Sequence, residues 1–146
     1  MNLATFERAQ LAAFAYRQAR GTGSLDCMKC ICYVLRNRVK AGWGDGSWLS
    51  VLEGAPLVDG NVYLPEHPVL FAAQDRMLQM LLREIDDIYL EGGMKIHADD
   101  TWTVVQDALY YQFADRDPNP WFLEHILRDT KNHPRIGQVG TIMLFR

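Results

Sequence analysis

The sequence predicts a single, mostly helical α+β domain that spans residues 1–146. A length of 146 residues is typical of one domain, which buries about two-thirds of the surface of its unfolded chain. Hydrophobic residues make up 49% of the chain and charged residues 23%, as in a globular rather than a disordered protein. Apolar residues recur every three or four positions in several segments, which indicates helices, and short apolar runs near the C-terminus indicate a small β-hairpin or sheet.

Two helices are predicted in the first 40 residues. The first covers about residues 4–20, where apolar side chains form one stripe at helical spacing, and two glycines follow it as a stop signal. Ser24 or Asp26 can cap the second helix, because both side chains accept hydrogen bonds from free backbone N–H groups. This second helix runs over about residues 25–39 and ends in basic residues and a glycine, which suit a helix C-terminus.

The middle of the chain is predicted to hold a small hairpin and one long helix. Residues 56–65, PLVDGNVYLP, place an Asp-Gly pair between two short apolar runs, which is typical of a tight hairpin turn. From about Pro68 to Leu90 apolar residues alternate at three and four positions, and two glycines follow. This pattern predicts one continuous helix.

The C-terminal third is predicted to contain short strands and a short helix. Residues 108–113, ALYYQF, indicate a strand or an extended segment. Asn119 can cap a short helix that Pro120 begins, since proline suits the first helical position. The tail RIGQVGTIMLFR predicts two strands that meet near Gly137 and Gly140.

Cys27, Cys30 and Cys32 form a C-x-x-C-x-C sequence within the second predicted helix. A zinc site needs a fourth ligand and a thioredoxin-like redox site needs a βαβ context, and the sequence offers neither. We therefore expect small, buried apolar side chains rather than a metal site or disulfides. The histidines are isolated from one another, and we expect loop or surface positions for His67, His97, His125 and His133.

Charge and targeting signals argue against several functional classes. The net charge is −3 and no run of Lys and Arg occurs, so no nucleic-acid partner is expected. Glu7 and Arg8 interrupt the apolar N-terminal residues, and polar residues interrupt the longest apolar region, so neither a signal peptide nor membrane insertion is expected. No nucleotide-binding loop occurs, and no cofactor is expected. We expect a chain that is cytoplasmic as synthesised.

Aromatic residues are concentrated in the C-terminal third. Tyr110, Tyr111, Trp121 and Phe122 lie within 13 residues of one another. Aromatic faces stack on sugar rings, but aromatic side chains also fill hydrophobic cores. The residues alone therefore leave two interpretations, a carbohydrate-binding groove or core packing.

Two separated sets of residues resemble one known family. Residues 16–21, YRQARG, are followed by a short turn and then by YVLRNRVKAG. Near the C-terminus, DALYYQF precedes PNPWF and PRIGQVGTIMLFR. This order and spacing resemble the bacterial cell wall hydrolase family that includes the spore-cortex-lytic enzymes, in which EARGE precedes VVLNRV, and GALYYYN, PPW and ARIGNHVFY follow. The resemblance covers most of the chain and is weakest over residues 42–105.

The resemblance implies a lysozyme-like, lytic-transglycosylase-type fold that acts on the glycan strands of peptidoglycan. In such enzymes one glutamate protonates the glycosidic oxygen between N-acetylmuramic acid and N-acetylglucosamine and then serves as base. The matching position here is Gln18. The resemblance further implies that Arg20, Tyr110, Tyr111 and Trp121 support the site or bind the sugar. A chain of this kind would reach the cell wall after lysis or through dedicated secretion.

An amide at position 18 changes the expected chemistry. It has the shape of the acid but cannot donate or take back the catalytic proton, and loss of a general acid typically lowers the rate about 10²- to 10⁴-fold. The chain is therefore expected to bind a glycan and to cleave it poorly or not at all. Three explanations are open: an introduced Glu→Gln substitution, a natural member that binds glycan or a partner without cutting, or an acid elsewhere in the chain.

Other carboxylates can be compared with Gln18 by position. Asp26, Glu53 and Asp59 are candidates for a substitute acid because each could approach the groove after folding. Glu7 lies on the same helical stripe as Gln18 but about 16 Å away, which is beyond proton-transfer distance. A non-catalytic binding module on the same fold is the alternative function, and a purely structural protein with no glycan affinity is a third.

Overall fold

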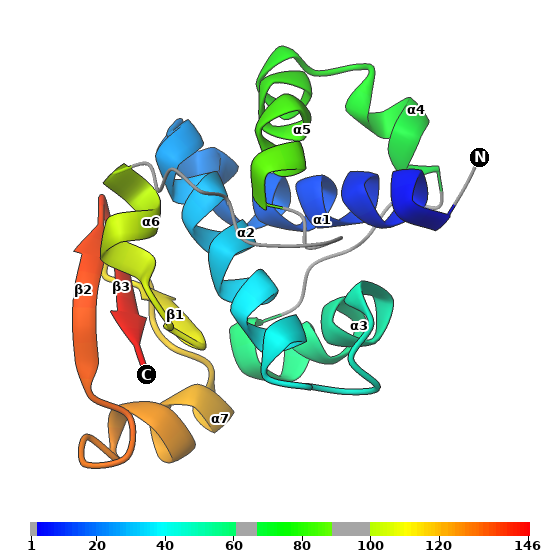
Figure 1. The fold of residues 1–146 in the computed structure, drawn as a ribbon. Helices are drawn as coiled ribbons and strands as arrows, with labels where there is room; N and C mark the ends of the chain where they lie inside the picture. The colour runs from blue at the N-terminus through cyan, green and yellow to red at the C-terminus, as the bar shows by residue number, and fades with distance from the viewer. Residues whose placement is uncertain (1–2, 61–66, 89–99) are drawn as a thin grey trace.

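The structure is a computed structural model and describes residues 3–60, 67–88 and 100–146. The elements are α1 (Leu3–Ala19), the 3-10 turn η1 (Arg20–Thr22), α2 (Leu25–Lys40), α3 (Trp48–Asp59), α4 (Pro68–Ala72), α5 (Arg76–Ile88), α6 (Asp100–Val105), β1 (Tyr110–Phe113), α7 (Pro120–Phe122), the π-helical turn η2 (Leu123–Leu127), β2 (Arg135–Val139) and β3 (Ile142–Phe145) (Figure 1). This mostly helical arrangement with one small sheet confirms the predicted α+β class.

The helices α1 and α2 form the centre of the fold, and both match their predicted ranges to within one residue. Every residue of α2 from Cys27 to Arg38 is buried except Lys29. The Ser24 hydroxyl accepts a hydrogen bond from the Cys27 N–H at 3.2 Å, so Ser24 rather than Asp26 caps α2. The helices α5 and α3 pack against opposite sides of α1 (Figure 1).

The predicted hairpin over residues 56–65 is wrong for its first half, because residues 56–59 belong to α3. The loop before α3 is held by Asp45, whose carboxylate accepts hydrogen bonds from the Ser50 hydroxyl at 2.7 Å and from the Ser47 N–H at 2.8 Å. The helix therefore begins well before the predicted hairpin. Apolar residues then recur at helical spacing through α3 and bury one face, and this period outweighs the Asp-Gly turn signal. Residues 61–65 of the prediction lie outside the described residues.

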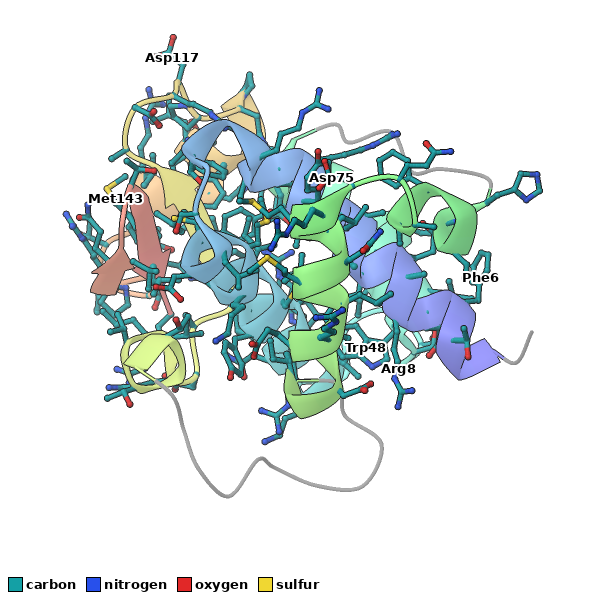
Figure 2. The ribbon with its side chains drawn as sticks, turned by 90° about the horizontal axis from the view of Figure 1, so that it is seen from above. Phe6, Arg8, Trp48, Asp75, Asp117 and Met143 are labelled. Atoms are coloured by element: carbon teal, nitrogen blue, oxygen red, sulfur yellow. The ribbon has the colours of Figure 1, made fainter. Side chains whose placement is uncertain are left out.

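The single helix predicted over residues 68–90 is divided in the structure into α4 and α5. Asp75 lies where the chain enters α5 (Figure 2), and its carboxylate accepts a hydrogen bond from the Leu78 N–H at 2.9 Å. An acceptor in this position caps a new helix, which explains the break in an otherwise continuous apolar pattern. The end predicted at Leu90 lies outside the described residues.

The three strands form an antiparallel sheet in the order β1-β3-β2. The strand β1 and the capped helix α7 lie where the sequence predicts them. The turn between β2 and β3 contains Gly140, whereas Gly137 lies inside β2 at a bulge. A side chain at Gly137 would meet Val104 of α6 at 2.9 Å, so glycine here permits close packing of α6, a helix that the sequence pattern did not predict.

Buried polar and sulfur groups complete the core around α2. The Asn37 amide donates hydrogen bonds of 2.9 Å to the carbonyls of Gln106 and Ala108, which joins α2 to the segment before β1. The three cysteines are buried free thiols, as expected. Burial raises the pKa of the Cys30 and Cys32 thiols above the usual range.

Surface positions agree with the expectations for the histidines that can be placed. His67 and His125 are exposed, His133 is half-buried, and His97 lies outside the described residues.

Within the three described ranges, no helix combines the length and the apolar character needed to cross a membrane.

Candidate functional site

Four elements that are distant in sequence meet at one buried ion pair. Arg38 of α2 binds Asp59 at the end of α3 through two hydrogen bonds, Nη1 to Oδ2 at 2.5 Å and Nη2 to Oδ1 at 2.8 Å. Neither side chain has any exposed surface. Gln18 of α1 and the tyrosines of β1 surround this pair, and we name the group the Asp59 junction: Gln18, Arg38, Asp59, Tyr110 and Tyr111.

The geometry of the pair is that of an ionised, bidentate contact. Burial raises the pKa of the Asp59 carboxyl, and the attraction and hydrogen bonds of Arg38 oppose that shift. The remaining Nε–H of Arg38 donates to the Leu109 carbonyl at 2.8 Å, and the Trp43 ring lies 4.8 Å from the guanidinium carbon. Two short, parallel hydrogen bonds favour the charged form of both partners. The pair therefore fixes α2, α3 and β1 relative to one another.

Gln18 points into this junction rather than into solvent. The residue is only 6% exposed, and its Nε2 donates a hydrogen bond of 3.3 Å to the backbone carbonyl of Asp59. The backbone carbonyl of Gln18 in turn accepts a hydrogen bond from Arg116 at 3.1 Å. The side chain at position 18 thus acts as a neutral donor toward an acceptor in α3, and it is buried rather than exposed in an open cleft with Tyr110 and Tyr111.

The two tyrosines of β1 occupy different environments. Tyr111 is buried and its hydroxyl has no hydrogen-bond partner among the described residues. Burial raises the pKa of Tyr111 well above its usual value and raises that of Tyr110 as well. Tyr110 is half-buried and packs on the rings of Trp43, His133 and Phe122. Tyr110 rather than Tyr111 therefore reaches the molecular surface.

A group of half-buried aromatic side chains extends from Tyr110. The Trp43 and Tyr110 ring centroids are 5.5 Å apart, and both rings pack with Trp121 against the small core cluster around Phe122. Trp121 also lies against His125, with 4.9 Å between the centroids. We name Trp43, Tyr110 and Trp121 the aromatic surface. Each of the three side chains is half-buried and packs against the cluster around Phe122.

Arg20 does not join the Asp59 junction. It is exposed in η1, and its positive charge acts on the pKa of Tyr16, whose hydroxyl donates to Asp75 at 2.8 Å. These contacts lie on the side of α1 that faces α4 and α5, whereas Gln18 contacts α3 on the opposite side. The structure therefore brings Gln18, Tyr110 and Tyr111 to the same ion pair, packs Trp121 and Tyr110 on the same Phe122 cluster, and separates Arg20 from them.

A polar pocket of about 520 Å³ lies at the C-terminal end of α1. Its lining combines hydroxyl groups with one carboxylate and one guanidinium: Thr22, Ser24, Thr141, Asp115 and Arg116. The loop that carries the two charged residues continues to Asp117, which projects into solvent (Figure 2). Arg116 connects this pocket to the Gln18 backbone, but the Gln18 side chain does not line it.

The carboxylates considered as substitutes for position 18 can now be located. Asp26 and Glu53 are exposed, whereas Asp59 lies directly beside Gln18. Both Asp59 oxygens are bound by Arg38, so this carboxylate is not available for proton transfer. Among the described residues, no group of three or more His, Cys, Asp and Glu side chains could hold a metal ion.

Sequence reasoning missed Arg38, although a signal for it was present. Arg38 continues the apolar stripe of Ile31 and Leu35 at helical spacing, and a charged side chain on a buried stripe requires a buried partner of opposite charge.

No known family model, curated protein or solved structure matches this chain.

Proposed function

We propose that this chain binds the glycan strands of peptidoglycan without cleaving them, as an acid-deficient protein of the lysozyme-like cell wall hydrolase type. The observation that carries the proposal is the environment of Gln18. Its amide fills a buried position beside the Asp59 carbonyl, where a carboxyl group would need its proton in order to make the same hydrogen bond. Position 18 thus holds a group with the shape of a general acid but without a transferable proton.

The same contact explains why a glutamate would suit this position. An ionised carboxylate would point a negative oxygen at the Asp59 carbonyl, so burial and the missing donor would both raise its pKa. A raised pKa keeps a general acid protonated near neutral pH, which glycoside cleavage requires. The position therefore suits a neutral acid, and the amide reproduces the hydrogen bond without the chemistry.

The surroundings of Gln18 support binding by two separate features. The aromatic surface presents half-buried rings, and such rings stack on the apolar faces of sugars. The polar pocket offers hydroxyl, carboxylate and guanidinium groups, which match the hydroxyl and amide groups of an amino sugar. Both features lie next to β1, one near Tyr110 and the other after Phe113.

The test compares the chain with Gln18→Glu on purified peptidoglycan, and the measurement is the release of soluble glycan fragments. We expect no release by the chain and measurable release by Gln18→Glu. Gln10→Glu is a matched control, because Gln10 is a buried glutamine of the same helix and its replacement introduces the same carboxyl group. Release by the unchanged chain would contradict the proposal, and no release by any variant with binding retained would indicate a module that never cleaved.

A further inference from the structure

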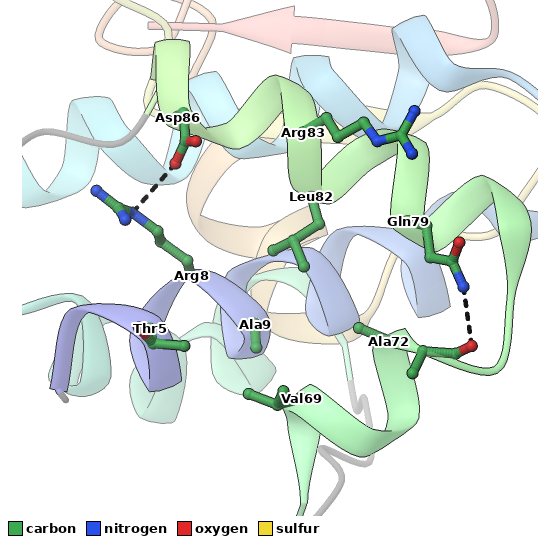
Figure 3. A pocket seen from close by; sticks show the side chains of 10 residues that line it. Thr5, Arg8, Ala9, Val69, Ala72, Gln79, Leu82, Arg83 and Asp86 are labelled. Atoms are coloured by element: carbon green, nitrogen blue, oxygen red, sulfur yellow. Dashed lines mark hydrogen bonds and ion pairs between the residues drawn. The ribbon is translucent and has the colours of Figure 1, made fainter. Parts of the chain in front are cut away.

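We propose that a second pocket, between α1, α4 and α5, binds aliphatic carboxylates. The pocket has a volume of about 530 Å³, within the range of small-molecule sites (Figure 3). Thr5, Arg8 and Ala9 contribute to it from the first half of α1, whereas Gln18 lies near the other end of that helix. This pocket is therefore separate from the Asp59 junction and independent of glycan binding.

The floor of this pocket is aliphatic. Ala9 and Ala72 are buried beneath it, and the half-buried Val69 and Leu82 form its walls. Figure 3 shows Leu82 descending from α5 toward Ala9 and Ala72. Among the described lining residues there is no aromatic ring. The floor consequently favours a flexible hydrocarbon chain over a sugar or a flat aromatic ligand.

The rim of the pocket carries more positive than negative charge. Arg8 and Arg83 line it together with one carboxylate, Asp86. The Arg8 Nε lies 3.5 Å from Asp86 Oδ1, and both side chains are partly exposed. Arg83 is exposed, and no hydrogen bond or ion pair within the described part of the chain engages it. A ligand carboxylate can therefore bind the Arg83 guanidinium without first breaking an ion pair to another described residue.

These two features together define the ligand class. A hydrocarbon chain of moderate length can cover the Ala9 and Ala72 methyl groups while its carboxylate reaches the rim. A neutral ligand of the same length would gain the apolar contact but lose the charge-assisted hydrogen bonds. The full chain should thus prefer decanoate to decanol.

The test is a calorimetric titration of the full chain with decanoate, below its critical micelle concentration, and with decanol, below its solubility limit. We expect saturable one-to-one decanoate binding, and about fivefold weaker binding after Arg83→Gln with no change for decanol. Arg76→Gln is the control, because Arg76 is also an exposed arginine of α5 but does not line the pocket. Val69→Phe, which fills the pocket from its half-buried wall, should weaken both ligands.

Several results would overturn this inference. Decanoate binding that does not saturate, or that Val69→Phe leaves unchanged, excludes this pocket as the site. Equal affinity for decanoate and decanol, or an equal effect of Arg76→Gln and Arg83→Gln, excludes recognition of the carboxylate. Circular dichroism of each variant verifies that folding is retained, and Arg83→Gln alters only an exposed side chain.

Discussion

Replacement of Asp59 by asparagine should lower the free energy of unfolding by much more than its small change in shape suggests. The substitution keeps the size of the side chain but removes the negative charge beside Arg38. The guanidinium then stays fully buried, with the Leu109 carbonyl and one amide oxygen in place of a bidentate carboxylate. A buried charge without its counter-charge destabilises the folded state because water solvates it better in the unfolded chain.

The expected loss follows from the burial of both partners. Removal of one partner from a buried ion pair typically costs about 3–5 kcal/mol, against a total free energy of unfolding of about 5–15 kcal/mol for a domain. We expect about 3 kcal/mol for Asp59→Asn, since the amide oxygen still accepts one hydrogen bond. The double variant Arg38→Met/Asp59→Asn should recover part of this loss, because it removes the isolated charge and leaves an apolar side chain of similar length.

Urea unfolding followed by tryptophan fluorescence measures these differences, and Trp43 lies against the Arg38 guanidinium as a local reporter. Asp107→Asn serves as the control, because Asp107 pairs with Arg146 at 2.9 Å and both side chains are about half exposed or more. That surface pair should contribute less than about 1 kcal/mol. The reasoning fails if Asp59→Asn costs no more than the control, or if the double variant is less stable than Asp59→Asn alone.

Three further predictions concern stability, acid sensitivity and thiol reactivity. Asn37→Ala should lower the free energy of unfolding by about 2–4 kcal/mol in urea, because it leaves the buried Ala108 carbonyl and the partly buried Gln106 carbonyl without their shared donor; a change below about 1 kcal/mol would contradict this role. Hydrogen bonds from the neighbouring serines lower the pKa of Asp45 from 3.8 to about 2. Its stabilising contribution is therefore complete above the unfolded value and disappears as the pH falls toward 2, so Asp45→Asn should flatten the acid limb of a stability–pH curve, and an unchanged limb would refute this. The Cys30 and Cys32 thiols should resist a thiol-specific disulfide reagent until the chain unfolds, and rapid labelling of the native protein would disagree with their burial.

The parts of the fold that the sequence predicts correctly depend on local signals. The ends of α1 and α2 follow from apolar periodicity and from the Ser24 cap, and the C-terminal strands follow from short apolar runs around Gly140. Competing local signals produced the errors. The Asp-Gly pair at the end of α3 suggested a turn, and the periodic residues around Asp75 concealed a new helix start.

The candidate site could be predicted only in part for a different physical reason. The family resemblance selected Gln18 and the β1 tyrosines, which the structure gathers around one ion pair. The pairing of Arg38 with Asp59, 21 positions later, depends on how α2 and α3 pack, and no local pattern encodes that contact. Arg20 lies two residues from Gln18 yet faces another side of the fold, because α1 ends at Ala19 and Arg20 belongs to the η1 turn.

Co-sedimentation with insoluble peptidoglycan whose stem peptides have been removed tests glycan-strand binding most directly. We predict that the chain sediments with this material while the glycan stays intact, and that Trp121→Ala weakens binding about fivefold through loss of a stacking surface. Leu123→Ala, which removes an exposed apolar side chain two residues away, should bind like the unchanged chain. If the chain remains in solution with this glycan, or if both variants bind equally well, the proposed glycan-binding site is wrong.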